Sequence, residues 1–148
     1  MKNLFIEILS SFFYIGYLPA SGTFATVASF FLVVLLYQLN IFFRIFIILF
    51  FIISGIYFSG SAESIFKNKD DKRIVIDEIV GFLIAMLGFY PTFLNLILCF
   101  LLFRFFDISK FFVLNKLQKL PYGVGIMFDD ILAGFFANVI LKFILFFF

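Results

Sequence analysis

The sequence predicts an all-α integral membrane protein, a compact bundle of about four to five transmembrane helices with a short N-terminal interfacial helix. Hydrophobic residues make up 65% of the 148 residues and the mean hydropathy is +1.22, so too few polar residues remain to cover a soluble domain. The apolar residues also gather in runs approaching the roughly 20 residues with which a helix crosses a bilayer. We therefore expect a single membrane domain over residues 1–148.

Residues 1–22 are expected to form an interfacial or re-entrant segment. The apolar run at residues 4–15 is too short to cross a hydrocarbon layer of roughly 30 Å. Gly16 and Pro19 break it. Glu7 interrupts the same run, which argues against a cleaved signal peptide.

Five apolar segments follow, and we expect each to span the membrane. Gln38 and Asn40 separate the first two, and a polar loop then precedes Ile74. Gly88 and Pro91 divide the next stretch into two helices, each short for a bilayer, so the number of spans stays at four to five. The expected spans are about residues 23–39, 41–58, 75–90, 92–106 and 130–148.

Positive charges indicate the orientation. The opposite connections carry only Arg44, whereas two loops are rich in lysine and arginine, which the positive-inside rule places in the cytoplasm. We expect a multi-pass membrane protein with its polar site facing the cytoplasm. The residues in those two loops are Lys67, Lys69, Lys72, Arg73, Lys110, Lys116 and Lys119.

This topology brings the unusual polar residues to one end of the bundle. The adjacent acids Asp129 and Asp130 stand out, because capping a helix needs only one of them and acids at a membrane boundary are costly. Asp129 could be that cap, while Lys67, Lys69 and Asp70 are expected to be a solvated part of their loop. The residues at the cytoplasmic helix ends are Ser21, Gly22, Thr23, Asp77, Glu78, Arg104, Asp107, Asp129 and Asp130.

Small residues recur at helical spacing behind these polar groups, a pattern that allows membrane helices to pack closely. We infer that the three helices pack together and that Asp77 and Asp130 point into a shared pocket. Glu78 and Asp129 project about 100° away on a regular helix, which suits supporting groups or caps. The three stripes are Asp130, Ala133, Gly134 and Ala137; Asp77, Gly81, Ala85 and Gly88; and Gly22, Ala25, Thr26 and Ser29.

Five carboxylates at one end of a bundle require compensating cations. The chain has no histidine, and its single cysteine, Cys99, lies in an apolar segment. An oxygen-only ligand set selects Mg²⁺, Mn²⁺ or Ca²⁺, and Mg²⁺ commonly joins carboxylates to a substrate phosphate. The candidate metal ligands and catalytic residues are Asp77, Glu78, Asp107, Asp129 and Asp130.

A phosphate would need donors of its own. Ser21, Gly22 and Thr23 begin a predicted helix, where free backbone N–H groups and the helix dipole favour anions. Arg104 shares a helical face with Asp107, so the carboxylate could orient the guanidinium for bidentate binding. The candidate substrate-binding residues are Ser21, Gly22, Thr23, Arg104 and Lys110, with Lys72 and Arg73 as further cations.

The composition excludes several other functions. A net charge of +2 offers too little basic surface for nucleic acid. Phosphatases with a histidine nucleophile are excluded, as are a Cys-x5-Arg loop and an Asp-x-Asp aspartyl-phosphate motif, because the chain contains none of these patterns. Attack on phosphorus by a metal-activated water remains.

Four sequence blocks resemble the phosphatidylglycerophosphatase A family. They are GYLPASGTFAT at 16–26, IVIDEIVGF at 74–82, FRFFDISK at 103–110 and GVGIMFDDILAGFFAN at 123–138. Ser21 stands where the family usually has proline, and Phe111 also replaces a proline. The resemblance implies an enzyme of the bacterial inner (cytoplasmic) membrane. It also implies Mg²⁺-dependent removal of the terminal phosphate monoester from phosphatidylglycerophosphate, a phospholipid held in the bilayer, to give phosphatidylglycerol for phospholipid biosynthesis.

Two other functions stay open at this point. A small ion or proton transporter could use membrane-boundary carboxylates as a relay, but it would distribute acids through the membrane depth. A non-catalytic assembly protein would explain the small-residue stripes but not the acids. The sequence leaves the number of metal ions, the general base and the oligomeric state open.

Overall fold

The computed structural model describes residues 2–109 and 120–147. Within these ranges the chain forms α-helices, one 3₁₀-helix and no strand, which confirms the all-α prediction. The elements are α1 (Lys2–Ser10), η1 (Ile15–Tyr17), α2 (Ser21–Tyr37), α3 (Ile41–Phe66), α4 (Ile76–Ala85), α5 (Phe93–Ser109) and α7 (Val124–Phe147).

Three helix ends differ from the expected segments. Helix α3 continues past residue 58 to Phe66, and α4 ends at Ala85 rather than near residue 90. Gly88, with φ of 90°, therefore lies in the turn after α4 and does not extend the small-residue stripe. Helix α7 begins at Val124, so Asp129 lies in its second turn and is not the N-cap.

Two of the described helices are long and apolar enough to cross a membrane by length and composition. They are α3, with a hydropathy of 2.5, and α7, with a hydropathy of 2.0. Large apolar side chains also face outward on several helices, including Phe31, Phe46 and Phe146, which are 68%, 68% and 83% exposed. A surface of this kind is typical of contact with lipid or another protein.

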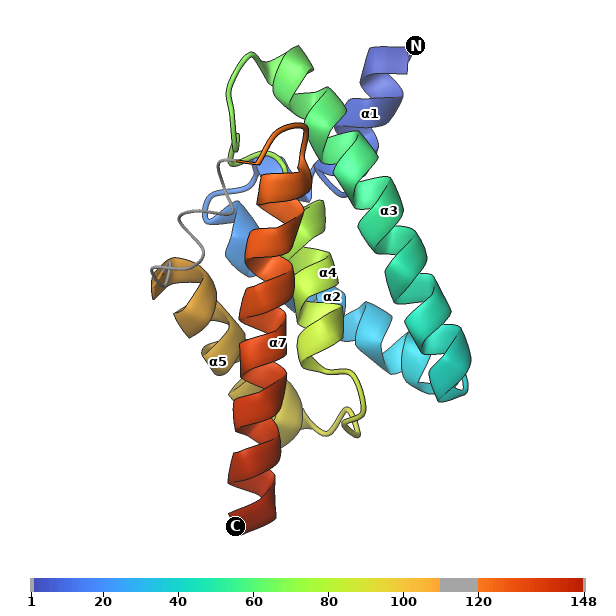
Figure 1. Ribbon diagram of the computed structural model, residues 1–148, viewed down its shortest axis with the longest axis vertical. Coiled ribbons are helices and arrows are strands. Elements are labelled where there is room, and N and C mark those ends of the chain that lie inside the picture. The colour runs from blue at the N-terminus through green and yellow to red at the C-terminus, as the bar shows by residue number, and fades with distance from the viewer. Residues whose placement is uncertain (1, 110–119, 148) are drawn as a thin grey trace.

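The helices pack around α4 and α7, which lie side by side in the middle of the molecule (Figure 1). Helix α4 also contacts α2, α3 and α5, whereas α1 packs on α3. Its short length leaves its last carbonyl groups inside the bundle, where they need partners. The Asn138 side-chain amide of α7 supplies them, donating to the carbonyls of Ile84, Ala85 and Leu87 at 3.3, 2.9 and 2.8 Å.

Glycine allows the backbones of α4 and α7 to touch. A Cβ atom at Gly134 would lie 2.1 Å from the Gly81 carbonyl oxygen, and one at Gly81 would lie 2.6 Å from the Asp130 carbonyl oxygen. Ala133 and Ala137 beside the contact are fully buried. The predicted small-residue packing of these two helices is thus confirmed, and it brings Asp130 to the start of α4.

The segment from Ser10 to Ser21 packs against the loop that leads into α4. The Val75 N–H donates to the Ser10 carbonyl at 3.0 Å, and the Ser21 hydroxyl donates to the Lys72 carbonyl at 2.7 Å. A Cβ at Gly16 would lie 2.0 Å from the Arg73 carbonyl oxygen, so only glycine allows this approach. These contacts place the loop and the start of α2 next to each other.

Arg73 anchors the same loop. Its guanidinium lies 3.9 Å from the ring centre of Phe66 and pairs with Asp71, with Nε to Oδ1 at 2.7 Å and Nη2 to Oδ2 at 2.9 Å. This charge-assisted pair lowers the pKa of Asp71 to about 2. The ion pair is therefore intact at neutral pH.

Replacing Gly134 by alanine should destabilise the bundle, because the new methyl group meets backbone atoms that cannot rotate away. Overpacking of this kind costs about 2 kcal/mol, measured as a lower unfolding temperature of the purified protein. Phe135→Ala, on the exposed face of the same helix, is the control. Equal stability of Gly134→Ala and the wild type would contradict the close helix contact.

Asp71→Asn should lower the unfolding temperature at pH 7 by a few degrees, because it removes the charged partner of Arg73. The folded-state pKa is below the ordinary value, so the stabilisation is complete above about pH 4 and is lost as the pH falls toward 2. The difference between wild type and variant should shrink over that window. A difference that stays constant from pH 7 to pH 2 would contradict the ion pair.

Candidate active site

The helix ends meet in a pocket of about 530 Å³. It collects residues from the segment before α2, the loop before α4, and helices α2, α4, α5 and α7, as the topology predicted. Its lining residues are Leu18, Pro19, Ala20, Ser21, Gly22, Thr23, Asp70, Lys72, Ile74, Asp77, Glu78, Arg104, Asp107, Ile108, Ile126, Asp129 and Asp130.

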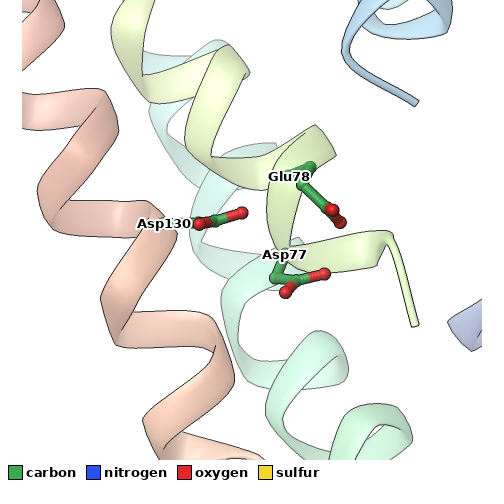
Figure 2. A group of neighbouring side chains, drawn as sticks. All are labelled: Asp77, Glu78 and Asp130. Carbon is green, nitrogen blue, oxygen red and sulfur yellow. The ribbon is translucent and has the colours of Figure 1, made fainter. Parts of the chain in front are cut away.

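Three carboxylates form the centre of the pocket. Asp77 and Glu78 lie in the first turn of α4, and Asp130 reaches toward them from α7 (Figure 2). One oxygen from each lies within 4.8 Å of the other two. Asp77 and Asp130 are 8% and 4% exposed, so water screens their mutual repulsion poorly.

Glu78 belongs to this group, although a regular helix places it about 100° away from Asp77. One of its carboxylate oxygens nevertheless lies within 4.8 Å of an oxygen of each aspartate. Glu78, one of the five candidate metal ligands, therefore lies in the three-carboxylate group, although helical spacing alone suggests a supporting position. Asp77 and Asp130 do share the pocket, as predicted.

The group has the properties of a cation site. Asp77 Oδ1, Glu78 Oε2 and Asp130 Oδ2 are buried and have no hydrogen-bond partner among the described residues. Buried carboxylate oxygens without partners are costly, and a divalent cation would satisfy all three. Three oxygen donors suit Mg²⁺, Mn²⁺ or Ca²⁺ better than zinc or copper.

Arg104 of α5 borders the carboxylates. Its Nη1 donates to Asp107 Oδ2 one turn further along the same helix. A Cβ at Gly22 would lie 2.5 Å from Glu78 Oε1 and 3.0 Å from Arg104 Nη1. Because Gly22 has no side chain, the Arg104 guanidinium and the Glu78 carboxylate can both lie against the start of α2.

Helix α2 begins at Ser21, as expected, after Ala20 in the left-handed region with φ of 55°. No side chain caps this helix end among the described residues, and the Thr23 N–H donates to the Ala20 carbonyl at 2.9 Å, so the N–H groups of Ser21 and Gly22 are the ones open to an anion. The Ser21 hydroxyl itself donates to the Lys72 carbonyl. Ser21 therefore joins two walls of the pocket, while Gly22 and Thr23 line it.

The other predicted residues have different positions. Asp129 and Asp107 line the pocket outside the three-carboxylate group. Lys110 lies outside the described residues. Asp70 is exposed, as expected of a residue in a solvated loop, and it also lines the pocket.

The sequence matches a known protein family over most of its length. The family model described as phosphatidylglycerophosphatase A matches residues 8–145. The chain belongs to the phosphatidylglycerophosphatase A family. Membership assigns it to the phosphoric monoester hydrolases and confirms the resemblance seen in the four sequence blocks.

Two proteins with similar sequences are named as phosphatases that act on phospholipids. A Haemophilus influenzae protein named phosphatidylglycerophosphatase A is 38% identical over 126 residues, covering 82% of this chain and 77% of that protein. A Bacteroides thetaiotaomicron protein, named provisionally as a phosphatidylinositol-3-phosphatase, is 34% identical over 98 residues, covering 64% of this chain and 61% of that protein. No solved structure matches the chain significantly.

Mg²⁺ should stabilise the protein through the three-carboxylate group. At about 100 times its Kd, a ligand bound only to the folded state adds about 2.7 kcal/mol, measurable as a rise in unfolding temperature. Asp77→Asn and Asp130→Asn should raise the metal-free unfolding temperature by relieving repulsion, and should abolish the Mg²⁺ response. Glu63→Gln, outside the pocket, should behave as wild type; an unchanged response in both aspartate variants would contradict the site.

Proposed function

We propose that the protein is a Mg²⁺-dependent phosphatase of the bacterial cytoplasmic membrane, which hydrolyses phosphatidylglycerophosphate to phosphatidylglycerol in phospholipid biosynthesis. The observation that carries this proposal is the meeting of three buried carboxylates, a guanidinium and an uncapped helix start in one pocket of a family of phosphatases. Carboxylates would hold the cation and the other groups the phosphate.

The two relatives support a lipid phosphate as the substrate. Both are named for lipids in which a phosphomonoester sits on a head group, and a phosphodiester joins that head group to diacylglycerol. The relative covering more of this chain is named for phosphatidylglycerophosphate. Two apolar side chains that line the pocket, Leu18 and Ile108, are exposed and could face the lipid.

The proposed membrane location is supported by α3 and α7, which are long and apolar enough to cross a bilayer, and by the exposed phenylalanine side chains. The positive-inside rule supports a cytoplasmic pocket, because Lys72 lines it and Arg73 lies in the same loop. Arg44 instead binds the carbonyls of Tyr37 and Leu39 at the far end of α2. The transporter alternative loses support, since the acids of α4, α5 and α7 gather in one pocket.

In the proposed reaction each residue of the pocket has a separate task. Asp77, Glu78 and Asp130 would hold Mg²⁺, which when bound supplies positive charge to the phosphate oxygens. Arg104 would bind further phosphate oxygens, with Asp107 fixing its orientation. The backbone N–H groups of Ser21 and Gly22 would bind the same phosphate, because the Thr23 N–H already donates to the Ala20 carbonyl.

Asp129 is the carboxylate we assign to proton transfer. It lines the pocket but lies outside the three-carboxylate group, so its carboxylate would not be needed to hold the cation and could accept a proton. Water would attack phosphorus and pass its proton to Asp129 as the bond between phosphorus and the head-group oxygen breaks; Asp129 would then return the proton to that oxygen, which becomes a hydroxyl group. The products are phosphatidylglycerol and inorganic phosphate.

The test is phosphate release from phosphatidylglycerophosphate by the purified protein, with Mg²⁺ and then with excess chelator. Release should require the metal and fall at least about 100-fold in Asp130→Asn and Asp129→Asn, in line with loss of metal-held charge or of a general base. Asp130→Asn should also lose Mg²⁺ binding, whereas Asp129→Asn should keep it. Chelator-resistant release, or an active Asp130→Asn protein, would refute the proposed site.

A further inference from the structure

One cation in the pocket has no task in the reaction described above. We propose that Lys72 binds the phosphodiester of the lipid, so that the pocket selects phosphomonoesters carried on a head group over those attached directly to diacylglycerol. The inference rests on the proposed phosphatase function and deepens it by assigning substrate selection to a residue. Lys72 is the uncommitted positive group among the described residues of the pocket.

Ion pairing distinguishes Lys72 from its neighbours. Of the two cations among the described lining residues, Arg104 is paired with Asp107, whereas Lys72 has no ion pair within the described part of the chain. The residues on either side of it, Asp71 and Arg73, are paired with each other. The charge of Lys72 is therefore left for a ligand.

The charge of the pocket explains why a second phosphate needs this lysine. Six carboxylates line the pocket against two cations. The bound metal and Arg104 would be occupied by the phosphomonoester, so a phosphodiester arriving beside it would meet uncompensated negative charge. An exposed lysine at the pocket wall supplies the compensation where the rest of the lipid head group must pass.

The position of Lys72 is fixed relative to the reaction centre. The Lys72 carbonyl accepts a hydrogen bond from the Ser21 hydroxyl at 2.7 Å. Gly22, which follows Ser21 in the chain, lies against Glu78 and Arg104. The backbone of the lysine is thus tied to the helix start that borders the three-carboxylate group. Its flexible ammonium group can follow a phosphodiester without needing the rigid geometry of a guanidinium.

Two lipids separate this role from general electrostatics. Phosphatidylglycerophosphate carries both phosphates, whereas phosphatidic acid carries only a phosphomonoester, directly on diacylglycerol. Both are presented in the same neutral detergent micelles with Mg²⁺, and kcat and KM are measured for each. If phosphatidic acid is not turned over, its inhibition constant against phosphatidylglycerophosphate replaces its KM.

Lys72→Gln should lower kcat/KM for phosphatidylglycerophosphate about tenfold, the size expected for one lost charge-assisted hydrogen bond, mainly through a higher KM. Its constant for phosphatidic acid should stay within about twofold of wild type. Lys72→Arg should restore most of the selectivity. Lys69→Gln, in the same loop but outside this pocket, is the matched control and should leave both lipids unaffected.

Two results would overturn the inference. Equal losses on both lipids in Lys72→Gln would mean that the lysine acts through general charge or folding. No loss on either lipid in Lys72→Gln would mean that the lysine does not contact the phosphodiester. Failure of the wild-type protein to hydrolyse either lipid would instead refute the proposed phosphatase function, so the two failures are distinguishable.

Discussion

The backbone contact between Gly81 and Gly134 is the constraint on which the site depends. It lets α4 and α7 approach so closely that acids from two distant parts of the chain share a single group of oxygens. A side chain at either glycine would separate the helices and open the group. Small residues, rather than large complementary ones, thus set the geometry of this site, as is common where helices pack in lipid.

The close approach of α4 and α7 brings three negatively charged side chains together, and their repulsion must be offset by other interactions. Asp77, Glu78 and Asp130 repel one another in a poorly hydrated place, and the described structure gives one oxygen of each no hydrogen-bond partner. Packing elsewhere must hold them together. A divalent cation would turn this local instability into binding energy, because binding adds directly to the stability of the folded state.

The chain before α2 contributes to the site through contacts with the loop that precedes α4. Gly16 allows it to lie on the backbone of Arg73, and Ser21 joins it to Lys72. Arg73, fixed by Asp71 and Phe66, keeps the loop before α4 in place. The residues that follow the short apolar segment, Leu18, Pro19 and Ala20, therefore line one side of the pocket.

The sequence by itself determined the helical class, the oxygen-only ligand set and the pairing of Asp77 with Asp130, because residue type and helical spacing encode these features locally. The resemblance of four blocks also led to the family. Only the tertiary structure decided which three of the five candidate carboxylates form the group, that Asp129 lies inside a helix, and that Asp70 lines the pocket. Helix ends, side-chain reach and loop paths depend on contacts between residues far apart in the chain, and spacing along one helix carries no information about them.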